Sequence, residues 1–398
     1  MRISTQAMFD QSIASLNQRQ GDLIKTGNQI ATGRRVVNPS DDPRAASQAV
    51  GLTQTRAALE QFSAARVSTR NSLSQEESIL NSVSDGITRS RTLILQASSG
   101  SLSDPDRVSL ASELRGIRET LIGQANATDG NGSYLFGGFQ DGSPPFVKDA
   151  SGAVVYVGDA NIREQRIDAS RLMPVTDHGQ SIFQSVQTGA GYVAEANAAN
   201  TGNLTFVGPK IIDTSDPDFG SLFTLDFTVT GADTSYSVNG GPAQPYVPGE
   251  PVTFGGLSLT LDGVPADGDS IQTGPGAQMN TDLFATLDKA IAALENPRID
   301  DSDTAALQNT LSTVLRELDR SLDNVLTIRA SVGARLNELD TVDIVSNNRV
   351  LSTEQTISEL LDLDLVKAIS DFTLRQVGLE AAQKTFTNIT GLSLFELL

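Results

Sequence analysis

The sequence predicts an α+β protein, in which long N- and C-terminal helices pair as coiled-coil rods and enclose a β-hairpin region and an inserted all-β domain. The first observation behind this class is the distribution of helix-breaking residues. Residues 130–276 hold 23 of the 34 glycines and 11 of the 15 prolines, whereas no proline follows Pro297. Because proline inside a helix costs about 3 kcal/mol, the proline-free ends permit long helices. The second is an apolar repeat near both termini whose spacing alternates between three and four residues, as in a coiled coil.

Composition excludes several classes of function. The chain has 398 residues, a formal net charge of −19 and no cysteine. The length allows two or three domains, and the acidity predicts neither nucleic acid nor a membrane as a partner. No run approaches the 18 apolar residues of a membrane span, and the first residues do not form a Sec-type signal. The lack of cysteine excludes disulfides and thiolate sites.

The first helix follows from its apolar repeat and is expected to end near Gly33. The seam consists of Phe9, Ile13, Leu16, Gln20, Leu23, Gly27 and Ile30. A connector follows, in which Asp42 before Pro43 is typical of a helix N-cap with proline at the first helical position. A second helix is expected from about residue 43 to 96. The same Asp-Pro pair at 104–105 is expected to begin a third helix, which the glycines at 130 and 132 would end.

The turn-rich middle is expected to be a series of short strands. Gly-Gly, Asp-Gly and Pro-Gly pairs separate its apolar runs, which indicates hairpins. From 184 to 276 the pattern fits a small β-sandwich or barrel. The expected strands include 134–136, 154–157, 165–167, 223–229, 236–238 and 257–261.

Helical patterning returns at Asp282 and continues almost to the C-terminus. Pro297 closes one helix, and Ser302 or Asp303 is expected to cap the next. The last helix carries a second coiled-coil seam with the same alternating spacing. This seam consists of Leu365, Ala368, Phe372, Arg375, Leu379, Ala382, Phe386 and Ile389.

Neither terminal helix can bury enough apolar surface alone to offset its ordering entropy. We therefore expect the two terminal helices to pair antiparallel and to pack against identical or related helical rods. The C-terminus is also unusually apolar for a free end, which predicts a buried interface there. The side chains expected at a subunit or chaperone interface are Phe9, Ile13, Leu16, Leu23, Ile30, Phe372, Leu379, Phe386, Ile389, Leu394, Phe395 and Leu398.

Signals for catalysis are weak, so we expect no enzyme activity, no cofactor and no metal site. The single histidine, His178, lies in a turn-like segment and is expected at the surface. The EF-hand pattern of a twelve-residue loop with a terminal glutamate is not met around Asp213, Asp216 and Asp218, so a turn is expected there. Asp267 and Asp269 are interpreted in the same way. The sequence has no GxSxG motif, phosphate-binding loop or GxGxxG motif.

Four segments resemble the flagellin superfamily and, within it, the hook-associated protein 3 family of hook–filament junction proteins. The first segment is shared with flagellins, whereas the second and third, in that order, resemble the junction proteins. The resemblance covers about 1–183 and 277–398, and residues 184–276 look like a variable insertion. The segments are ATGRRVVNPSDDPRAAS at 31–47, NGSYLFGGFQDGSPPF at 131–146, YVGDANIREQRI at 156–167 and TNITGLSLFELL at 387–398.

The resemblance implies a structural subunit of the bacterial flagellum, exported by the flagellar type III apparatus and located outside the cell. Its implied partners are further copies of itself in a ring, hook-associated protein 1, flagellin and an export chaperone. Three parts are implied: an inner terminal coiled coil, a helical rod domain with the β-hairpin region, and an inserted outer β domain. Their respective boundaries are 1–42 with 358–398, 43–183 with 277–357, and 184–276.

The family's inter-domain linker maps onto Asn38, Pro39, Asp41 and Asp42. These residues also fit a plain helix cap, and Arg34 and Arg35 before them fit either intersubunit ion pairs or solvated surface. The apolar run 134–139 fits an intersubunit contact or the hairpin's own packing. Two rival functions remain: a flagellin filament subunit, and a secreted carbohydrate-binding or enzymatic protein displayed on helical stalks with its site in 184–276.

Overall fold

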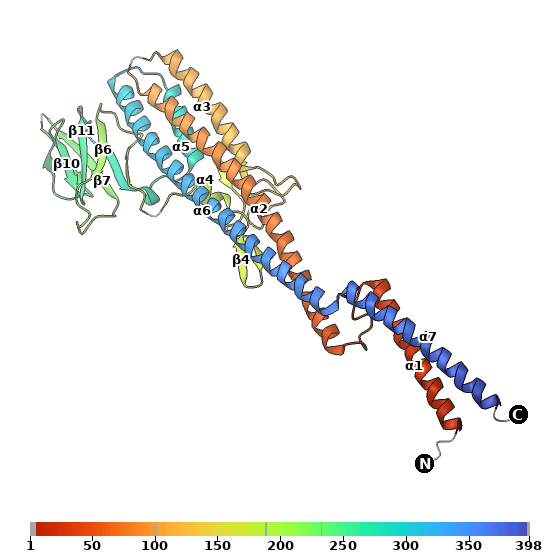
Figure 1. Cartoon of the computed structure of the whole chain (residues 1–398). Coiled ribbons are helices and arrows are strands. Elements are labelled where there is room, and N and C mark those ends of the chain that lie inside the picture. The colour runs from red at the N-terminus through yellow and green to blue at the C-terminus, as the bar shows by residue number, and fades with distance from the viewer. Residues whose placement is uncertain (1–4, 101, 188, 232, 396–398) are drawn as a thin grey trace. The chain divides into compact units, whose positions relative to one another are not determined.

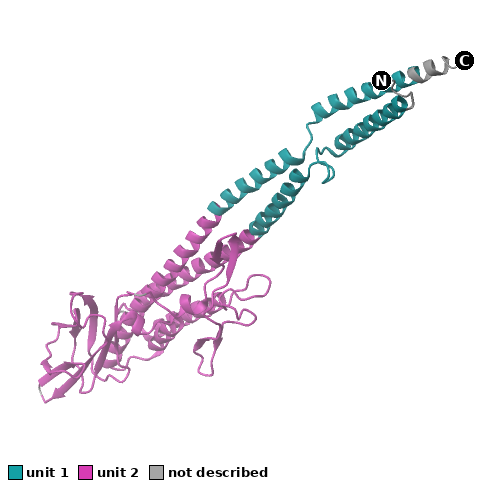
Figure 2. Cartoon of the chain, turned by 90° about the horizontal axis from the view of Figure 1, so that it is seen from below, with its two compact units in different colours: residues 1–64, 341–398 teal, residues 65–340 magenta. Residues whose placement is uncertain are grey.

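The computed structural model describes residues 5–100, 102–187, 189–231 and 233–395. Its contacts divide the chain into two compact units, shown in Figure 2. Unit 1 comprises residues 1–64 and 341–398, and unit 2 comprises residues 65–340. The two longest helices contribute residues to both units: α2 (Pro43–Ala97) and α6 (Asp301–Leu361).

Unit 1 contains an antiparallel pair of terminal helices, α1 (Thr5–Thr32) and α7 (Leu365–Phe395), side by side in Figure 1. The Phe9 and Phe386 rings lie 5.3 Å apart between centroids. Further along, the Asp22 carboxylate lies 3.5 Å from the Arg375 guanidinium. Because rising numbers on α1 meet falling numbers on α7, the pair is antiparallel, which confirms the predicted pairing.

Most helix limits agree with the sequence, and three differ. The helix α3 (Asp104–Ala125) is capped by Ser103 in a capping box rather than by Asp104. It also ends before the glycines, because the Asn126 side chain forms two hydrogen bonds with the Phe146 backbone and redirects the chain. At the start of α6, neither Ser302 nor Asp303 is the N-cap. The Asp300 carboxylate accepts from both of their backbone N–H groups.

The helical part of unit 2 is a packed bundle. The unit 2 portions of α2 and α6 lie alongside α3 and the shorter α5 (Leu283–Glu295) in Figure 1. One leucine from each helix has no solvent exposure: Leu80, Leu114, Leu287 and Leu318. Burying a leucine contributes about 1.5–3 kcal/mol, so this bundle is the rigid support for the rest of unit 2.

Two hairpins and a short helix follow α3. They are β1 (Phe146–Lys148) with β2 (Val154–Tyr156), β3 (Glu164–Asp168) with β4 (Arg171–Pro174), and α4 (Gly179–Phe183).

The expected strand at 134–136 is wrong. Tyr134 makes one isolated bridge to Thr128, and Leu135 and Phe136 lie in turns. The chain folds back there, because the Tyr134 N–H donates to the Asp141 carbonyl.

Residues 192–275 form a β-sandwich rather than a barrel. All pairings are antiparallel, and the two sheets share a buried core that includes Phe206, Phe227 and Leu259. The first sheet has the order β5–β12–β7–β8–β9 and the second β10–β11–β6. The strands are β5 (Tyr192–Ala196), β6 (Thr205–Ile211), β7 (Phe223–Thr230), β8 (Asp233–Val238), β9 (Gln244–Pro245), β10 (Pro251–Phe254), β11 (Leu257–Asp262) and β12 (Ser270–Pro275).

Two side chains of α6 cover the edge of the sandwich next to the bundle. The Asn309 amide donates to the Leu204 carbonyl at 2.8 Å and accepts from the Phe206 N–H at 3.1 Å. The Thr313 hydroxyl donates to the Ala194 carbonyl at 2.7 Å. These bonds occupy backbone groups on β5, on β6 and at the residue just before β6, and both strands are at the edges of their sheets. Because open edges invite pairing with other chains, α6 both anchors and protects the inserted domain.

Candidate assembly interface

The predicted terminal seam is present but only partly covered. Leu16, Leu23 and Ile30 on α1 are half-buried, as are Phe372, Leu379 and Phe386 on α7. Phe9 and Ile13 remain 44% and 37% exposed. Among the described side chains of α1 and α7, the buried ones are Thr26 and Ala368, and the interface prediction omitted both. Their small size gives no sequence signal beyond the position of Ala368 in the repeat.

A second apolar surface runs along α7. Val366 is 79% exposed and Leu374 70% exposed, and Ile369 and Val377 are both more than half exposed. Residues three, four or eight apart share one side of a helix, so the four form a stripe, which we name the outer stripe. Contiguous exposed apolar surface marks interaction sites. The terminal helices therefore present uncovered apolar surface on more than the seam.

Four predicted interface residues cannot be placed in this way. Leu398 lies outside the described residues. For Ile389, Leu394 and Phe395 the structure describes a helical backbone and no side-chain surroundings.

The connector between α1 and α2 is a compact, hydrogen-bonded turn. The Asp41 carboxylate accepts from the N–H groups of Val37 and Asn38 and pairs with Lys25 at 2.9 Å. Hydrogen bonds from the Asn38 backbone and from Lys25 lower the pKa of Asp41. The Asp42 carboxylate accepts from the Ala45 N–H at 3.1 Å, which is the expected N-cap geometry before Pro43.

The connector is also tied to the turn between α6 and α7. Arg35 donates from its backbone N–H to the Leu361 carbonyl, and its guanidinium reaches the Leu360 carbonyl at 2.7 Å. The Leu363 N–H donates to the carbonyl of Gly33, whose φ is +68°. Arg35 also pairs with Asp42 at 3.2 Å. In the described structure, Arg35 therefore binds residues of its own chain. This is neither of the two interpretations, an intersubunit ion pair or a solvated surface, that the sequence left open.

The apolar run 134–139 divides into two groups. Leu135 and Phe136 are 1% and 0% exposed, and the Phe136 ring packs edge-on against Phe183. Phe139, three residues later, is 60% exposed. The first group therefore forms the hairpin's own packing, and Phe139 stays available for contact.

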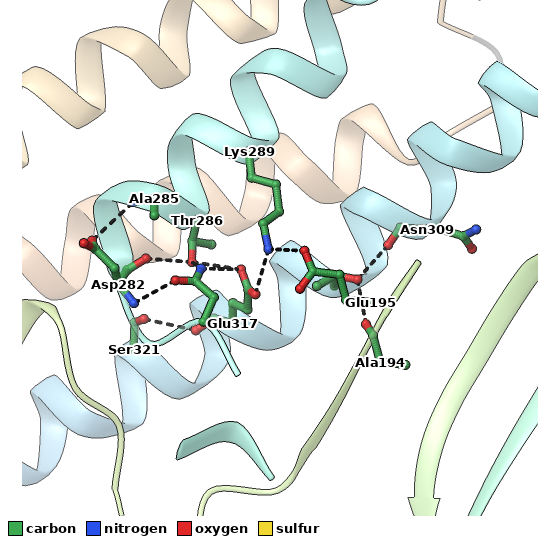
Figure 3. Close-up of polar contacts among 11 residues, drawn as sticks. Ala194, Glu195, Asp282, Ala285, Thr286, Lys289, Asn309, Glu317 and Ser321 are labelled. Carbon is green, nitrogen blue, oxygen red and sulfur yellow. Dashed lines mark hydrogen bonds and ion pairs between the residues drawn. The ribbon is translucent and has the colours of Figure 1, made fainter. Parts of the chain in front are cut away.

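A buried polar cluster joins α5 and α6 to the first strand of the sandwich (Figure 3). The Lys289 ammonium lies 2.7 Å from a Glu195 carboxylate oxygen and 3.1 Å from one of Glu317. The other Glu317 oxygen accepts from Thr286 and Asn280. Burial raises the pKa of Glu317. Burial alone would lower the pKa of Lys289, yet the two glutamates raise it. The mutually paired charges fit an anchor rather than a reactive centre.

The other residues that the sequence suggested as candidates for chemistry also have structural roles. His178 is half-buried rather than fully at the surface, and its Nδ1 accepts from the Ser181 N–H as the cap of α4. Asp213 and Asp216 accept from backbone N–H groups two residues on, as in turns. Asp269 is buried and binds three backbone N–H groups of the loops around it.

Among the residues that the structure describes, no three His, Asp or Glu side chains are grouped so that they could hold a metal ion. Among those residues there is also no helix with the length and apolarity needed to cross a membrane.

The comparisons with known proteins agree with this architecture. Residues 3–141 match the family model for the bacterial flagellin N-terminal helical region. Flagellar hook-associated protein 3 of Escherichia coli K12 is 36% identical over 400 residues, covering 100% of this chain and 99% of that protein. The crystal structure of flagellar hook-associated protein 3 from Legionella pneumophila has a TM-score of 0.70 at 28% identity, covering 78% of this chain and 98% of that one.

A flagellin is also similar to this chain, though less so. Polar flagellin F of Vibrio parahaemolyticus is 24% identical over 80% of this chain and 84% of that protein.

Proposed function

The chain belongs to the flagellar hook-associated protein 3 family and is a structural component of the flagellar junction, and we propose that it joins hook-associated protein 1 on the cell side to flagellin on the distal side. Several copies form the junction as a ring. One face of the ring packs on hook-associated protein 1, and the other serves as a template for the first flagellin subunits.

The observation that carries this proposal is the uncovered apolar surface of the terminal helices. Phe9 and Ile13 on the seam and Val366 and Leu374 on the outer stripe stay exposed when α1 and α7 are paired. Burying apolar surface contributes about 25 cal/mol per Å², so neighbouring rods would stabilise both helices. A subunit with such ends is suited to assembly rather than to work as a free monomer.

We further propose three radial parts. The terminal coiled coil lines the export channel, the helical rod domain with its hairpins forms the next shell, and the inserted sandwich faces solvent. Their respective boundaries are 1–42 with 358–398, 43–183 with 277–357, and 184–276. Asn38, Pro39, Asp41 and Asp42 form the linker between the first two parts and set the angle between them.

The chain reaches the outside of the cell unfolded, through the flagellar type III apparatus. Before export, a chaperone binds the apolar C-terminal helix, from Phe372 through the last ten residues at 389–398, and later subunit packing covers the same segment. Removing the last ten residues should therefore abolish chaperone binding or incorporation while the sandwich still folds. Normal motility of that strain would contradict this role.

Deleting the gene tests the junction role. We expect cells that keep their hooks, lose their filaments and shed flagellin into the medium. Filaments attached at normal numbers in the deletion strain would refute the proposal.

Seeded assembly distinguishes the flagellin alternative. Purified protein added to filament seeds should add a short cap and stop, whereas a flagellin would extend long filaments.

A further inference from the structure

The hairpin β1–β2 and its neighbouring loop expose a group of apolar side chains. Val147 and Val155 lie directly opposite each other in the register, and both are about 40% exposed. Val157 lies two residues beyond Val155, so it points to the same face, and it is 45% exposed. The backbone of Phe139, which is 60% exposed, binds Asp159 two residues beyond Val157, and we name Phe139 and the three valines the hairpin patch.

The backbone that carries Phe139 is fixed by its neighbours. The Asp159 carboxylate accepts from the Phe139 N–H at 3.0 Å, and the Asp159 N–H donates to the Gly137 carbonyl. Gly138 has a φ of +67°, and a Cβ there would lie 2.1 Å from an Asp159 carboxylate oxygen. The Tyr156 hydroxyl lies 3.0 Å and 2.7 Å from the carbonyls of Phe136 and Asp159. An exposed aromatic ring on a fixed backbone binds with little further loss of entropy and is typical of an interface anchor.

Unit 1 contains a mostly apolar groove that could receive such a ring. The groove has a volume of about 290 Å³ and lies between the connector, the first turns of α2 and the end of α6. Val50, on its wall, is 60% exposed. An enclosed apolar cavity of about 150 Å³ holds benzene, so this open groove has at least the volume that a phenylalanine ring needs. We name it the linker groove, lined by Val36, Val37, Pro39, Ala49, Val50 and Leu361, with Arg34 among its walls.

The charges beside the two surfaces are complementary. Arg34 is exposed at the groove, and Asp159 lies directly beneath Phe139. Within the part of the chain that the structure describes, neither group forms a salt bridge, and the half-buried His178 imidazole is the titratable group that acts on Asp159. Hydrogen bonds from the Phe139 and Asn161 N–H groups lower the pKa of Asp159, which keeps its carboxylate negative at neutral pH.

We propose that Phe139 of one copy of this chain inserts into the linker groove of a second copy, with Asp159 of the first facing Arg34 of the second. This rests on the proposed ring of several copies. The contact joins two different surfaces, so it is heterologous and propagates around a ring or along a helix instead of closing as a dimer. The contact pairs the hairpin patch with the linker groove and gives Arg34 an ion-pair partner.

The absence of cysteine permits a direct test by disulfide trapping. Gln140→Cys places a thiol beside Phe139 without removing the ring, and Val50→Cys places one on the groove wall. The double variant, as the only copy in the cell, is oxidised in isolated flagella and run on a non-reducing gel. We expect a ladder of dimers, trimers and larger species. Each single variant should remain almost entirely monomeric, because the proposed contact brings position 140 of one copy to position 50 of the next.

A third substitution in the double variant tests the anchor. Phe139→Ala should lower the cross-linked fraction at least tenfold, and Phe139→Leu should restore most of it. Leu172→Ala, which truncates another exposed side chain on the neighbouring hairpin strand β4, is the matched control and should leave the ladder unchanged.

Three results would overturn the contact. A fast-migrating monomer band would mean that the two sites meet within one chain. Efficient dimers from Gln140→Cys alone would mean that two hairpin patches face each other. A double variant that carries filaments but shows no ladder would exclude this contact while the ring proposal stands. If amine cross-linking of the same flagella also gave only monomers of this chain, the ring itself would be wrong.

Discussion

Replacing Glu76 with glutamine should change how the stability of unit 2 depends on pH. Glu76 lies on α2 with no solvent exposure, and one carboxylate oxygen accepts from the Asp177 N–H at 3.1 Å. The other oxygen has no hydrogen-bond partner among the described residues. Burial, followed by the nearby Asp177 carboxylate, raises the pKa of Glu76 to about 8. Arg335, which pairs with Asp177, opposes this rise and does not cancel it.

The direction of the pH effect follows from the proton balance. In the unfolded chain the pKa of Glu76 is near its ordinary value of 4.5. Between about pH 4.5 and 8 the folded protein therefore holds one more proton than the unfolded chain. The stabilising contribution is fully present below 4.5 and is lost as pH rises through 8. The slope is about 1.4 kcal/mol per pH unit, or roughly 5 kcal/mol over the whole window.

The assay is urea unfolding of the full chain followed by far-ultraviolet circular dichroism at pH 5.5, 6.5 and 7.5. Glu76→Gln keeps the shape and cannot ionise, so the variant should gain on the wild type by about 1.4 kcal/mol for each pH unit. Glu77→Gln removes the neighbouring, half-exposed partner of Arg329 and should shift stability by less than about 1 kcal/mol. A difference between Glu76→Gln and wild type that stays constant across the three pH values would refute the reasoning.

Three further predictions concern the terminal helices and the inserted domain. In dilute monomer, amides of α1 and α7 should exchange rapidly and those in the unit 2 part of α2 slowly, and hydrogen-exchange mass spectrometry that finds the termini equally protected would contradict assembly-coupled folding. Asn309→Ala leaves the Leu204 carbonyl and Phe206 N–H without their partner, so thermal unfolding should show a loss of about 1–3 kcal/mol for each group. Thr310→Ala, whose hydroxyl bonds only within its own helix, is the control and should change little. Lys289→Met should cost about 3–5 kcal/mol because it leaves buried Glu317 without its counter-ion; adding Glu317→Gln should recover much of this loss in the same assay, and no recovery would mean that the two charges are not coupled.

The helices could be predicted from the sequence because the patterns that specify them are local. Proline-free runs, the Asp42-Pro43 cap and the seam spacing all act within a few residues, and α2 begins at Pro43 as predicted. The end of α3 was not readable. It depends on the Asn126 side chain meeting the Phe146 backbone twenty residues later, and nothing in the local glycine pattern encodes that meeting.

For the candidate surfaces, the sequence predicts less than it does for the helices. Leu135, Phe136 and Phe139 lie within five residues and are all apolar, yet only Phe139 is exposed. Whether these side chains are buried or exposed depends on Phe183 and Asp159, which lie elsewhere in the chain. Glu76 lies on α2 between the buried Leu73 and Leu80, and the Asp177 N–H that binds it is 101 residues away in the chain. Sequence periodicity predicts which face of a helix or strand is apolar. It does not predict which other segment covers that face.

The number of covering helices explains why similar repeats have different outcomes in the two units. In the unit 2 part of α2, Leu73, Leu80 and Ile87 lie seven residues apart and are 0% exposed, because three other helices share that bundle. In α1 and α7, Ala368 is the only buried apolar seam residue among those whose side chains are described. Two helices cover one side of each other, so the heptad pattern in the termini encodes more contacts than one chain can make. In the proposed ring, neighbouring rods supply the rest, and this uncovered apolar surface, rather than any reactive group, is what links the sequence to the proposed assembly.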